Sequence, residues 1–226
     1  MTPPAAVKPP VRIAIIGAGA VSDYHHVPGI ALDPRAELVL ACDQDAARLE
    51  TCREKWHVPR TTTDPAAACA DEGVDAVIIA TPNDTHRPIA LDAARHGKHV
   101  MCEKPLALSA AEVAEMHRAA AEAGVVHMTA FTYRFAPSMR YLKHLVDTGA
   151  LGTPRHFRSQ RFLDLPEPSW GWRQYQARAG AGDLFDMTIH RIDFAMHLLG
   201  PLARLSGAVA RFAERTETAT GGRCDP

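Results

Sequence analysis

The sequence lacks an excess of either charge and lacks any long apolar run, and these absences exclude several classes of protein. It carries 25 basic and 26 acidic residues, for a formal net charge of -1. Proteins that bind nucleic acid or anionic lipid through their electrostatic field need a basic excess, so neither partner is expected. No uninterrupted apolar stretch approaches the roughly 18 residues of a membrane-spanning helix, so no membrane span is expected. Residues 1–10 are interpreted as a short flexible tail, not as a signal peptide.

Cysteine is sparse, and its spacing excludes the common cysteine-based sites. No two of the five cysteines form a C-x-x-C pair, and no metal-type cluster forms. Four of them fall in apolar or helical stretches, where a thiol usually acts as a small hydrophobic group. We therefore expect a cytoplasmic protein with reduced thiols and no metal. The five cysteines are Cys42, Cys52, Cys69, Cys102 and Cys224.

What the sequence does have is a glycine turn directly after a β-branched run. Val11–Ile16 is typical of a buried parallel strand, and it is followed by Gly17, Gly19 and a segment with helical patterning. Gly17 permits the tight turn, and Gly19 lets the backbone approach a pyrophosphate that meets the amides of the next helix. The third position of this dinucleotide-binding motif holds Ser22, where Gly or Ala is usual. Serine is small enough for close packing of the helix on the strand. The predicted cofactor-binding residues of this turn are Gly17, Gly19, Ala20 and Val21.

An acidic residue follows the second predicted strand, at the distance that a dinucleotide-binding unit requires. Residues 37–42 are strand-like and end at Asp43, whose carboxylate would accept hydrogen bonds from the adenosine ribose. The alternative is an exposed Asp that caps the helix beginning near Gln44. An Asp here repels a 2′-phosphate, and no Arg follows it directly. The cofactor predicted from this position is therefore NAD, with NADP less likely.

The remaining pattern up to residue 130 alternates strands with helices, which implies a doubly wound parallel sheet. Strands are expected at 75–80, 99–103 and 125–130. Helices are expected at 44–56, from Asp64 as N-cap, at 86–96, and at 109–123, where Ser109 and Glu112 form a capping box. Ligands bind at the carboxyl ends of the strands in such a sheet. The segments that end there supply further predicted cofactor-binding residues: Thr81, Pro82, Asn83, His86, Glu103 and Lys104.

Lys104 is the first candidate for catalysis. It follows the strand at 99–103 and precedes Pro105, which fixes the turn. A buried lysine beside a nicotinamide ring would have a lowered pKa and could assist proton transfer. From position alone, an ordinary surface lysine in a loop is an equally good interpretation.

The pattern changes after Ala130, and residues 131–226 are interpreted as a second, α+β domain. Helices are expected at 137–147 and 182–199, strands at 154–162 and 205–212, and a loop at 163–173. One helix face carries a polar stripe, with Asp186 one turn before His190. An apolar stripe beside it is expected to face the core. The polar stripe is Asp186, His190, Asp193 and His197, and the apolar stripe is Phe185, Ile189, Ile192, Met196 and Leu199.

The polar stripe has three interpretations. Asp186 can orient the imidazole of His190 and keep its basic nitrogen facing outward, as a general base requires. A solvated polar face is the usual role of such a stripe. A shared metal ion is the weakest of the three, because no third strong ligand stands at a fixed offset.

Together these segments resemble the Gfo/Idh/MocA family of oxidoreductases. The resemblance rests on the glycine turn, Thr81-Pro82-Asn83 with His86, Glu103-Lys104-Pro105, and residues 180–193. It implies a Rossmann domain at 11–130 and a C-terminal α+β domain with an open, mostly antiparallel sheet. It further implies hydride transfer between NAD(P) and a carbon of a sugar, an inositol or a related polyol. His190 would be the base assisted by Asp186, and Lys104 would hydrogen-bond the reacting oxygen. Four residues are weaker candidates for substrate contacts: Tyr133, Arg134, Trp172 and Arg173. For these four, a packing role is at least as good an interpretation.

The chain ends sooner than this family pattern does, because members continue with several more strands of the second sheet. We therefore expect that sheet to be incomplete here, which argues against the homo-oligomer that it often mediates. Two alternatives to a dehydrogenase remain from the sequence. One is a glycosidase that oxidises its substrate transiently with bound NAD, and the other is a shortened, catalytically silent nucleotide-binding protein.

Overall fold

The computed structural model describes residues 9–162 and 171–210. The chain divides into two compact units, Met1–Ala130 and Phe131–Pro226, and each is described by itself. Most of the predicted tail at 1–10 lies outside the described residues. Within the described part of the chain, no helix is long and apolar enough to cross a membrane.

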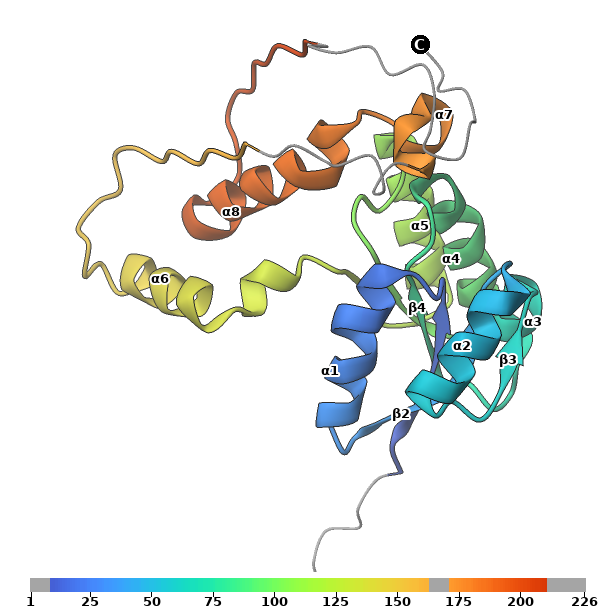
Figure 1. The fold of residues 1–226 in the computed structure, drawn as a ribbon. Helices are drawn as coiled ribbons and strands as arrows, with labels where there is room; N and C mark the ends of the chain where they lie inside the picture. The colour runs from blue at the N-terminus through green and yellow to red at the C-terminus, as the bar shows by residue number, and fades with distance from the viewer. Residues whose placement is uncertain (1–8, 163–170, 211–226) are drawn as a thin grey trace, which may run out of the picture. The chain divides into compact units, whose positions relative to one another are not determined.

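The first unit is built on a six-stranded parallel sheet in the order β3-β2-β1-β4-β5-β6. Figure 1 labels β2, β3 and β4 together with the helices of this unit. Strand order reverses between β1 and β4, and this switch point is where open α/β sheets bind their ligands. The predicted doubly wound Rossmann sheet is confirmed. Its strands are β1 (Val11–Ile16), β2 (Ala36–Cys42), β3 (Thr61–Thr62), β4 (Ala76–Ile79), β5 (His99–Cys102) and β6 (His127–Thr129).

Helices alternate with these strands, and side-chain caps set where several of them begin. Asp45 accepts hydrogen bonds from the amides of Ala47 and Arg48 at the start of α2. Asp64 caps α3 and Ser109 caps α5, as the sequence predicts. The helices are α1 (Val27–Leu32), α2 (Ala46–Trp56), α3 (Pro65–Ala70), α4 (His86–Arg95) and α5 (Ala110–Glu122), with a π-helix η1 (Ser22–His26) running into α1 and a 3-10 turn η2 (Asn83–Thr85) before α4.

The core of this unit lies on both faces of the sheet, because successive strand residues point to opposite sides. On β1, Ala14 and Ile16 pack against α3, α4 and α5, whereas Ile15 packs toward α1. On β4, Ile79 and Ile78 divide between the two faces in the same way. This two-sided burial holds the strand ends, and hence the loops that follow them, at fixed positions.

The second unit is helical over its described residues. The segments 154–162 and 205–210, where strands were expected, form neither helix nor strand, and the rest of the second expected strand lies outside the described residues. A strand forms only where a neighbour satisfies its backbone groups, and neither segment has a β-partner in the described structure. Most of the loop expected at 163–173 also lies outside the described residues. The elements are η3 (Thr132–Phe135), α6 (Pro137–Asp147), η5 (Trp172–Gln174), α7 (Gln176–Ala179), the π-helix η6 (Leu184–Thr188) and α8 (Ile189–Leu199).

The prediction that the apolar stripe faces the core is wrong for α8. His190 and Asp193 of the polar stripe are buried, whereas Met196 and Leu199 of the apolar stripe are 44% and 45% exposed. The buried face of α8 also carries Phe194 and Leu198, and the ion pair of Asp193 and the ring contacts of His190 described below keep these two polar side chains on that inward face.

Candidate active site

Gly17 is required by the fold itself. It follows β1 with a φ angle of 103°, and a Cβ built on it would lie 2.4 Å from the carbonyl oxygen of Ala80. Its amide donates to the carbonyl of Cys42 at 2.7 Å. Gly19 differs, because a Cβ there would meet no atom within 4 Å. Packing within the chain therefore demands glycine at 17 but leaves open space at 19.

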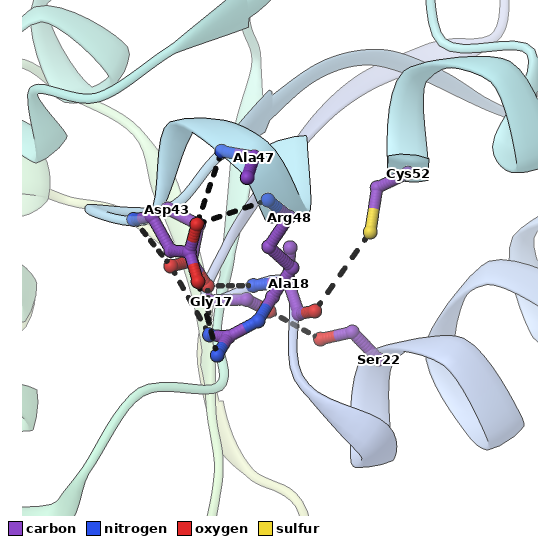
Figure 2. Close-up of polar contacts among 8 residues, drawn as sticks. Gly17, Ala18, Ser22, Asp43, Ala47, Arg48 and Cys52 are labelled. Atoms are coloured by element: carbon purple, nitrogen blue, oxygen red, sulfur yellow. Dashed lines mark hydrogen bonds and ion pairs between the residues drawn. The ribbon is translucent and has the colours of Figure 1, made fainter. Parts of the chain in front are cut away.

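Ser22 turns out to be an integral part of this turn. The residue is fully buried, and its hydroxyl donates to the carbonyl of Gly17 at 2.6 Å (Figure 2). The helix after the turn begins at Ala20, and its first bond runs from the amide of Asp23 to the carbonyl of Gly19 at 3.1 Å. The departure from the usual Gly or Ala thus adds a hydrogen bond that ties this helix to the strand end.

Asp43 lies directly beside the glycine turn. Its Oδ2 accepts from the amide of Ala18 at 2.8 Å, and its Oδ1 accepts from the amide of Asp45 at 3.0 Å. Arg48 of α2 donates through Nη1 to both oxygens at 3.2 Å (Figure 2). The carboxylate is therefore oriented toward the turn, and the helix cap that the sequence left open for it is made by Asp45 instead.

His86 joins the loops that follow β4 and β5. Its Nδ1 lies 2.8 Å from the carbonyl of Pro105, and its Nε2 lies 2.9 Å from the carbonyl of Thr81. The side chain is fully buried, and this burial lowers the pKa of His86 against the raising effect of the two carbonyls. Asn83 is also buried in the same loop. His86 therefore connects the loop after β4, at Thr81, to the loop after β5, at Pro105.

Glu103 is anchored by a residue that the sequence analysis did not find. His26, at the end of η1, donates from Nε2 to Oε1 of Glu103 at 2.9 Å, and both side chains are buried. Burial raises the pKa of Glu103. The hydrogen bond and charge of His26, together with Lys104, lower it by more than burial raises it, so the pKa of Glu103 lies below its ordinary value. No local spacing points to His26, because it lies 77 residues from its partner.

Lys104 is half-buried beside this pair. Its amide donates to Oε2 of Glu103 at 3.2 Å, and its peptide bond to Pro105 is cis. The anchored carboxylate therefore fixes the backbone at Lys104 where β5 ends. Since β2, β1, β4 and β5 are consecutive in the sheet, Asp43, the glycine turn, the loop at Thr81 and Lys104 lie along one edge of it.

In the second unit, aromatic edges surround His190. The ring of Tyr133 meets the imidazole edge-on with centroids 4.9 Å apart, and Phe131 does so at 6.0 Å. Tyr133 also contacts Phe194 of α8 at 5.5 Å. His190 is 4% exposed, so these rings and the rest of α8 enclose most of its imidazole.

Two ion pairs hold the elements near His190. Arg134 donates from Nε to both oxygens of the buried Asp193 at 3.0 Å, and its Nη2 contacts Oδ1 as well. This hydrogen bonding raises the pKa of Arg134. Arg173 lies 3.4 Å from Asp186 and stacks over the ring of Trp172 at 4.4 Å. The four expected substrate residues thus all make packing or ionic contacts within this unit.

The first unit fits a dinucleotide. The open space at Gly19 lies before the first turn of a helix, whose leading amides have no acceptor within that helix. Asp43 supplies an acidic group beside it, and Lys104 lies two strands away, beyond β4, at the same edge. In the described part of the chain, no three His, Cys, Asp or Glu side chains are grouped so that they could hold a metal ion.

Comparison with known proteins gives matches along most of the chain. A model described as an oxidoreductase family with an NAD-binding Rossmann fold matches residues 11–131, and one described as the GFO/IDH/MocA C-terminal domain matches residues 139–223. Levoglucosan dehydrogenase of Pseudarthrobacter phenanthrenivorans is 31% identical over 94% of this chain and 57% of the relative. Myo-inositol 2-dehydrogenase of Thermotoga maritima is 33% identical over 84% of this chain and 55% of the relative.

A solved structure shows the same likeness in three dimensions. Levoglucosan dehydrogenase in complex with NADH and L-sorbose has a TM-score of 0.72 and 29% identity, over 84% of this chain and 53% of that chain. The chain spans about half the length of the curated relatives it matches.

Proposed function

Because the chain belongs to the GFO/IDH/MocA family of oxidoreductases, we propose that it is an NAD-dependent dehydrogenase of polyhydroxy compounds. The reaction is reversible hydride transfer between the nicotinamide and a hydroxyl-bearing carbon of a sugar, an inositol or a related polyol. The relatives described above, which are named for levoglucosan and myo-inositol, support this substrate class. Which polyol is used depends on loops that vary freely on such folds.

The observation that carries the proposal is the anchored Glu103–Lys104 pair at the end of β5. The buried His26 lies on the helix that follows the glycine turn, and its Nε2 lies 2.9 Å from Oε1 of Glu103. One network therefore fixes both the proposed phosphate site and the proposed catalytic lysine. A surface lysine in an ordinary loop needs no such anchor, so this geometry favours the functional interpretation of Lys104.

On the cofactor side, each residue has a defined task in this proposal. The amides after Gly19 bind the pyrophosphate, and Asp43 accepts hydrogen bonds from the ribose hydroxyls. Thr81, Pro82 and Asn83 line the nucleotide where β4 ends, with Ala20 and Val21 opposite them on the helix. His86 and Glu103 act as positioning residues, because both are buried and bonded within the protein.

On the substrate side, a bound nicotinamide would supply the hydride acceptor and donor, and the residues of the chain would position the substrate and move its proton. Lys104 hydrogen-bonds the reacting oxygen, and His190 takes the hydroxyl proton as the general base. Asp186 stabilises the imidazolium that results, and Arg173 holds Asp186 through its ion pair. Tyr133 packs on His190 and limits its movement, while Arg134 fixes α8 through Asp193. Trp172 supports Arg173 from one face.

Three features implied by the resemblance remain predictions. They are the open antiparallel sheet of the second domain, oligomerisation through it, and residence in the cytoplasm. The domain division at residue 130 coincides with the boundary between the compact units, which supports separate cofactor and substrate domains.

The direct test is NADH formation at 340 nm with a panel of sugars and inositols. Lys104→Met is expected to lower kcat by about a hundredfold or more, the usual loss when a hydrogen-bond donor to the developing oxyanion is removed. Lys55→Met is the matched control, because Lys55 is an exposed lysine that pairs with Asp23. Equal turnover of wild type and Lys104→Met would exclude the assigned role.

The same assay separates the alternatives. Release of free sugar without net NADH would indicate a glycosidase that uses NAD transiently. Nucleotide binding without turnover of any compound in the panel would indicate a binding protein. Substrate-dependent NADH in one-to-one yield supports the dehydrogenase.

A further inference from the structure

Arg48 occupies the position at which the adenosine ribose is expected to contact Asp43. Its Nη1 lies 3.2 Å from each oxygen of that carboxylate (Figure 2). Its Nη2 lies 3.6 Å from Asp45, the cap of the same helix. No arginine follows Asp43 directly in the sequence, but the first turn of α2 brings one back onto it.

The carboxylate of Asp43 is saturated by these contacts. A carboxylate offers about four lone-pair sites. Two are used by the amides of Ala18 and Asp45, and Arg48 approaches both oxygens. The two amides belong to the backbone of the turn and of the helix cap, so they stay in place. A ribose hydroxyl can therefore reach Asp43 only where Arg48 withdraws.

Arg48 is able to withdraw. Its side chain is 49% exposed, whereas that of Asp43 is 11% exposed. Its contact with Asp45 joins two half-exposed side chains, a kind of pair that contributes little to stability, and its 3.2 Å contacts with Asp43 are longer than the usual length of about 2.7–2.9 Å for a charge-assisted hydrogen bond. The guanidinium of Arg48 can therefore move away while the carboxylate of Asp43 stays in place.

A displaced Arg48 remains beside the ribose, where its positive charge offsets the repulsion between Asp43 and a 2′-phosphate. Guanidinium groups bind phosphate in a planar, bidentate geometry, and an arginine near the ribose is what accommodates NADP in Rossmann sites. We propose that Arg48 sets the cofactor preference of this site: it competes with NAD for Asp43 and binds the 2′-phosphate of NADP, so that NADP is accepted as a second cofactor. The inference rests on the proposed nucleotide site and adds a determinant of its specificity.

This role makes a prediction that a simple surface ion pair does not. Removing the guanidinium should act in opposite directions on the two cofactors. NADPH loses its phosphate partner, whereas NADH gains an uncovered Asp43. An arginine that only stabilises α2 would, when removed, affect both nucleotides alike or neither.

The test is fluorescence titration of the full chain with NADH and with NADPH. For Arg48→Gln we expect NADPH binding to weaken by about tenfold or more, and NADH binding to stay equal or to strengthen by up to about fivefold. Arg48→Lys keeps the charge without the planar fork, so its NADPH affinity should fall between those of wild type and Arg48→Gln. The matched control is Arg53→Gln on the same helix, because Arg53 is 50% exposed and pairs with Glu50; both affinities should stay unchanged.

Each outcome bears on a specific statement. Parallel changes for both nucleotides in Arg48→Gln, or no change in either, overturn the role of Arg48. So does a wild-type protein that binds NADH but shows no binding of NADPH. Absence of binding by either nucleotide overturns the proposed function together with this inference, and so distinguishes the two failures.

Discussion

The two units hold their candidate residues by different means. In Met1–Ala130 the residues follow strands whose side chains are buried on both faces, and Ile15, Ile16 and Ile79 are almost completely inaccessible. In the described part of Phe131–Pro226, the buried apolar residues are Ala179, Phe194 and Leu198. There, ring edges and ion pairs hold the candidate residues. A sheet buried on both faces thus positions the strand ends that carry the first site, whereas contacts between individual side chains alone position the second.

The strongest test of this contrast is a pair of glycine substitutions in the first unit. Gly17→Ala places a Cβ 2.4 Å from the Ala80 carbonyl at a positive φ, so the turn and β4 must separate. We expect a loss of about 3–5 kcal/mol in the free energy of unfolding, the range of severe core disruption. Urea unfolding followed by circular dichroism measures it.

Gly19→Ala is the matched variant, because its Cβ meets no atom of the chain. We expect its unfolding free energy to stay within about 1 kcal/mol of wild type, since only ordinary helix-end propensities change. Its affinity for NADH should fall, because the methyl group occupies the space proposed for the pyrophosphate. A variant that keeps full affinity would remove Gly19 from the phosphate site.

In the second unit, the loss of a single ion pair should also lower the free energy of unfolding substantially. Arg134→Met leaves the buried carboxylate of Asp193 without its main partner. Breaking a buried pair costs about 3–5 kcal/mol, and the partial exposure of Arg134 reduces our expectation to about 2 kcal/mol. Tryptophan fluorescence during urea unfolding measures the loss, and Trp172 lies in this unit.

The control for that variant is nucleotide affinity. Because the cofactor residues belong to the other unit, NADH binding by Arg134→Met should equal that of wild type. A joint loss of stability and NADH affinity would show that the units depend on each other for cofactor binding.

Glu103 allows a finer test through pH. Its folded pKa is lowered from 4.5, so its contribution to stability is complete above that value and is lost as pH falls through the folded value. Glu103→Gln still accepts from His26 but has no charge, and we expect it to be about 1 kcal/mol less stable at neutral pH. The difference in melting temperature from wild type should be constant above about pH 5 and should shrink as pH falls below 4.5. A difference that is constant with pH would mean that the charge of Glu103 is not stabilising.

The sequence predicted features that depend on near neighbours. The strand periodicity, the caps at Asp64 and Ser109, and the glycine turn are all encoded within a few residues, and the structure has them. The anchoring of Glu103 by His26 could not be read from spacing, because it joins residues 77 positions apart. The contact of Arg48 with Asp43 depends on a side-chain rotamer that no sequence pattern specifies.

The second unit shows the same limit more strongly. Its helices at 137–147 and near 189–199 follow from local periodicity and are present. The expected strands need partners elsewhere in the chain, and the inward face of α8 depends on Arg134 and Tyr133, which contact Asp193 and His190 from another element. Local patterns specify elements, but long-range side-chain pairs decide which face of an element is buried.

The smallest expected effect belongs to an ion pair at the opposite end of the sheet. Asp75 lies directly before β4, and Arg12 donates to it from its backbone amide at 2.9 Å and from its guanidinium at 2.7 Å. These hydrogen bonds lower the pKa of Asp75 to about 2. Its stabilising contribution is therefore complete above its ordinary value of 3.8 and disappears as pH falls toward 2.

Both side chains of this pair are more than a third exposed, so solvent screening limits its energy. We expect Asp75→Asn to reduce stability by less than about 1 kcal/mol at neutral pH, with no change in NADH affinity because the pair lies away from the carboxyl ends of the strands. Thermal melts at pH 7 and pH 3 in low and high salt measure it, and high salt should reduce the difference further. If Asp75→Asn lost more stability than Glu103→Gln, it would contradict the view that buried side-chain contacts at the site edge of the sheet stabilise the fold more than exposed ion pairs at the opposite edge.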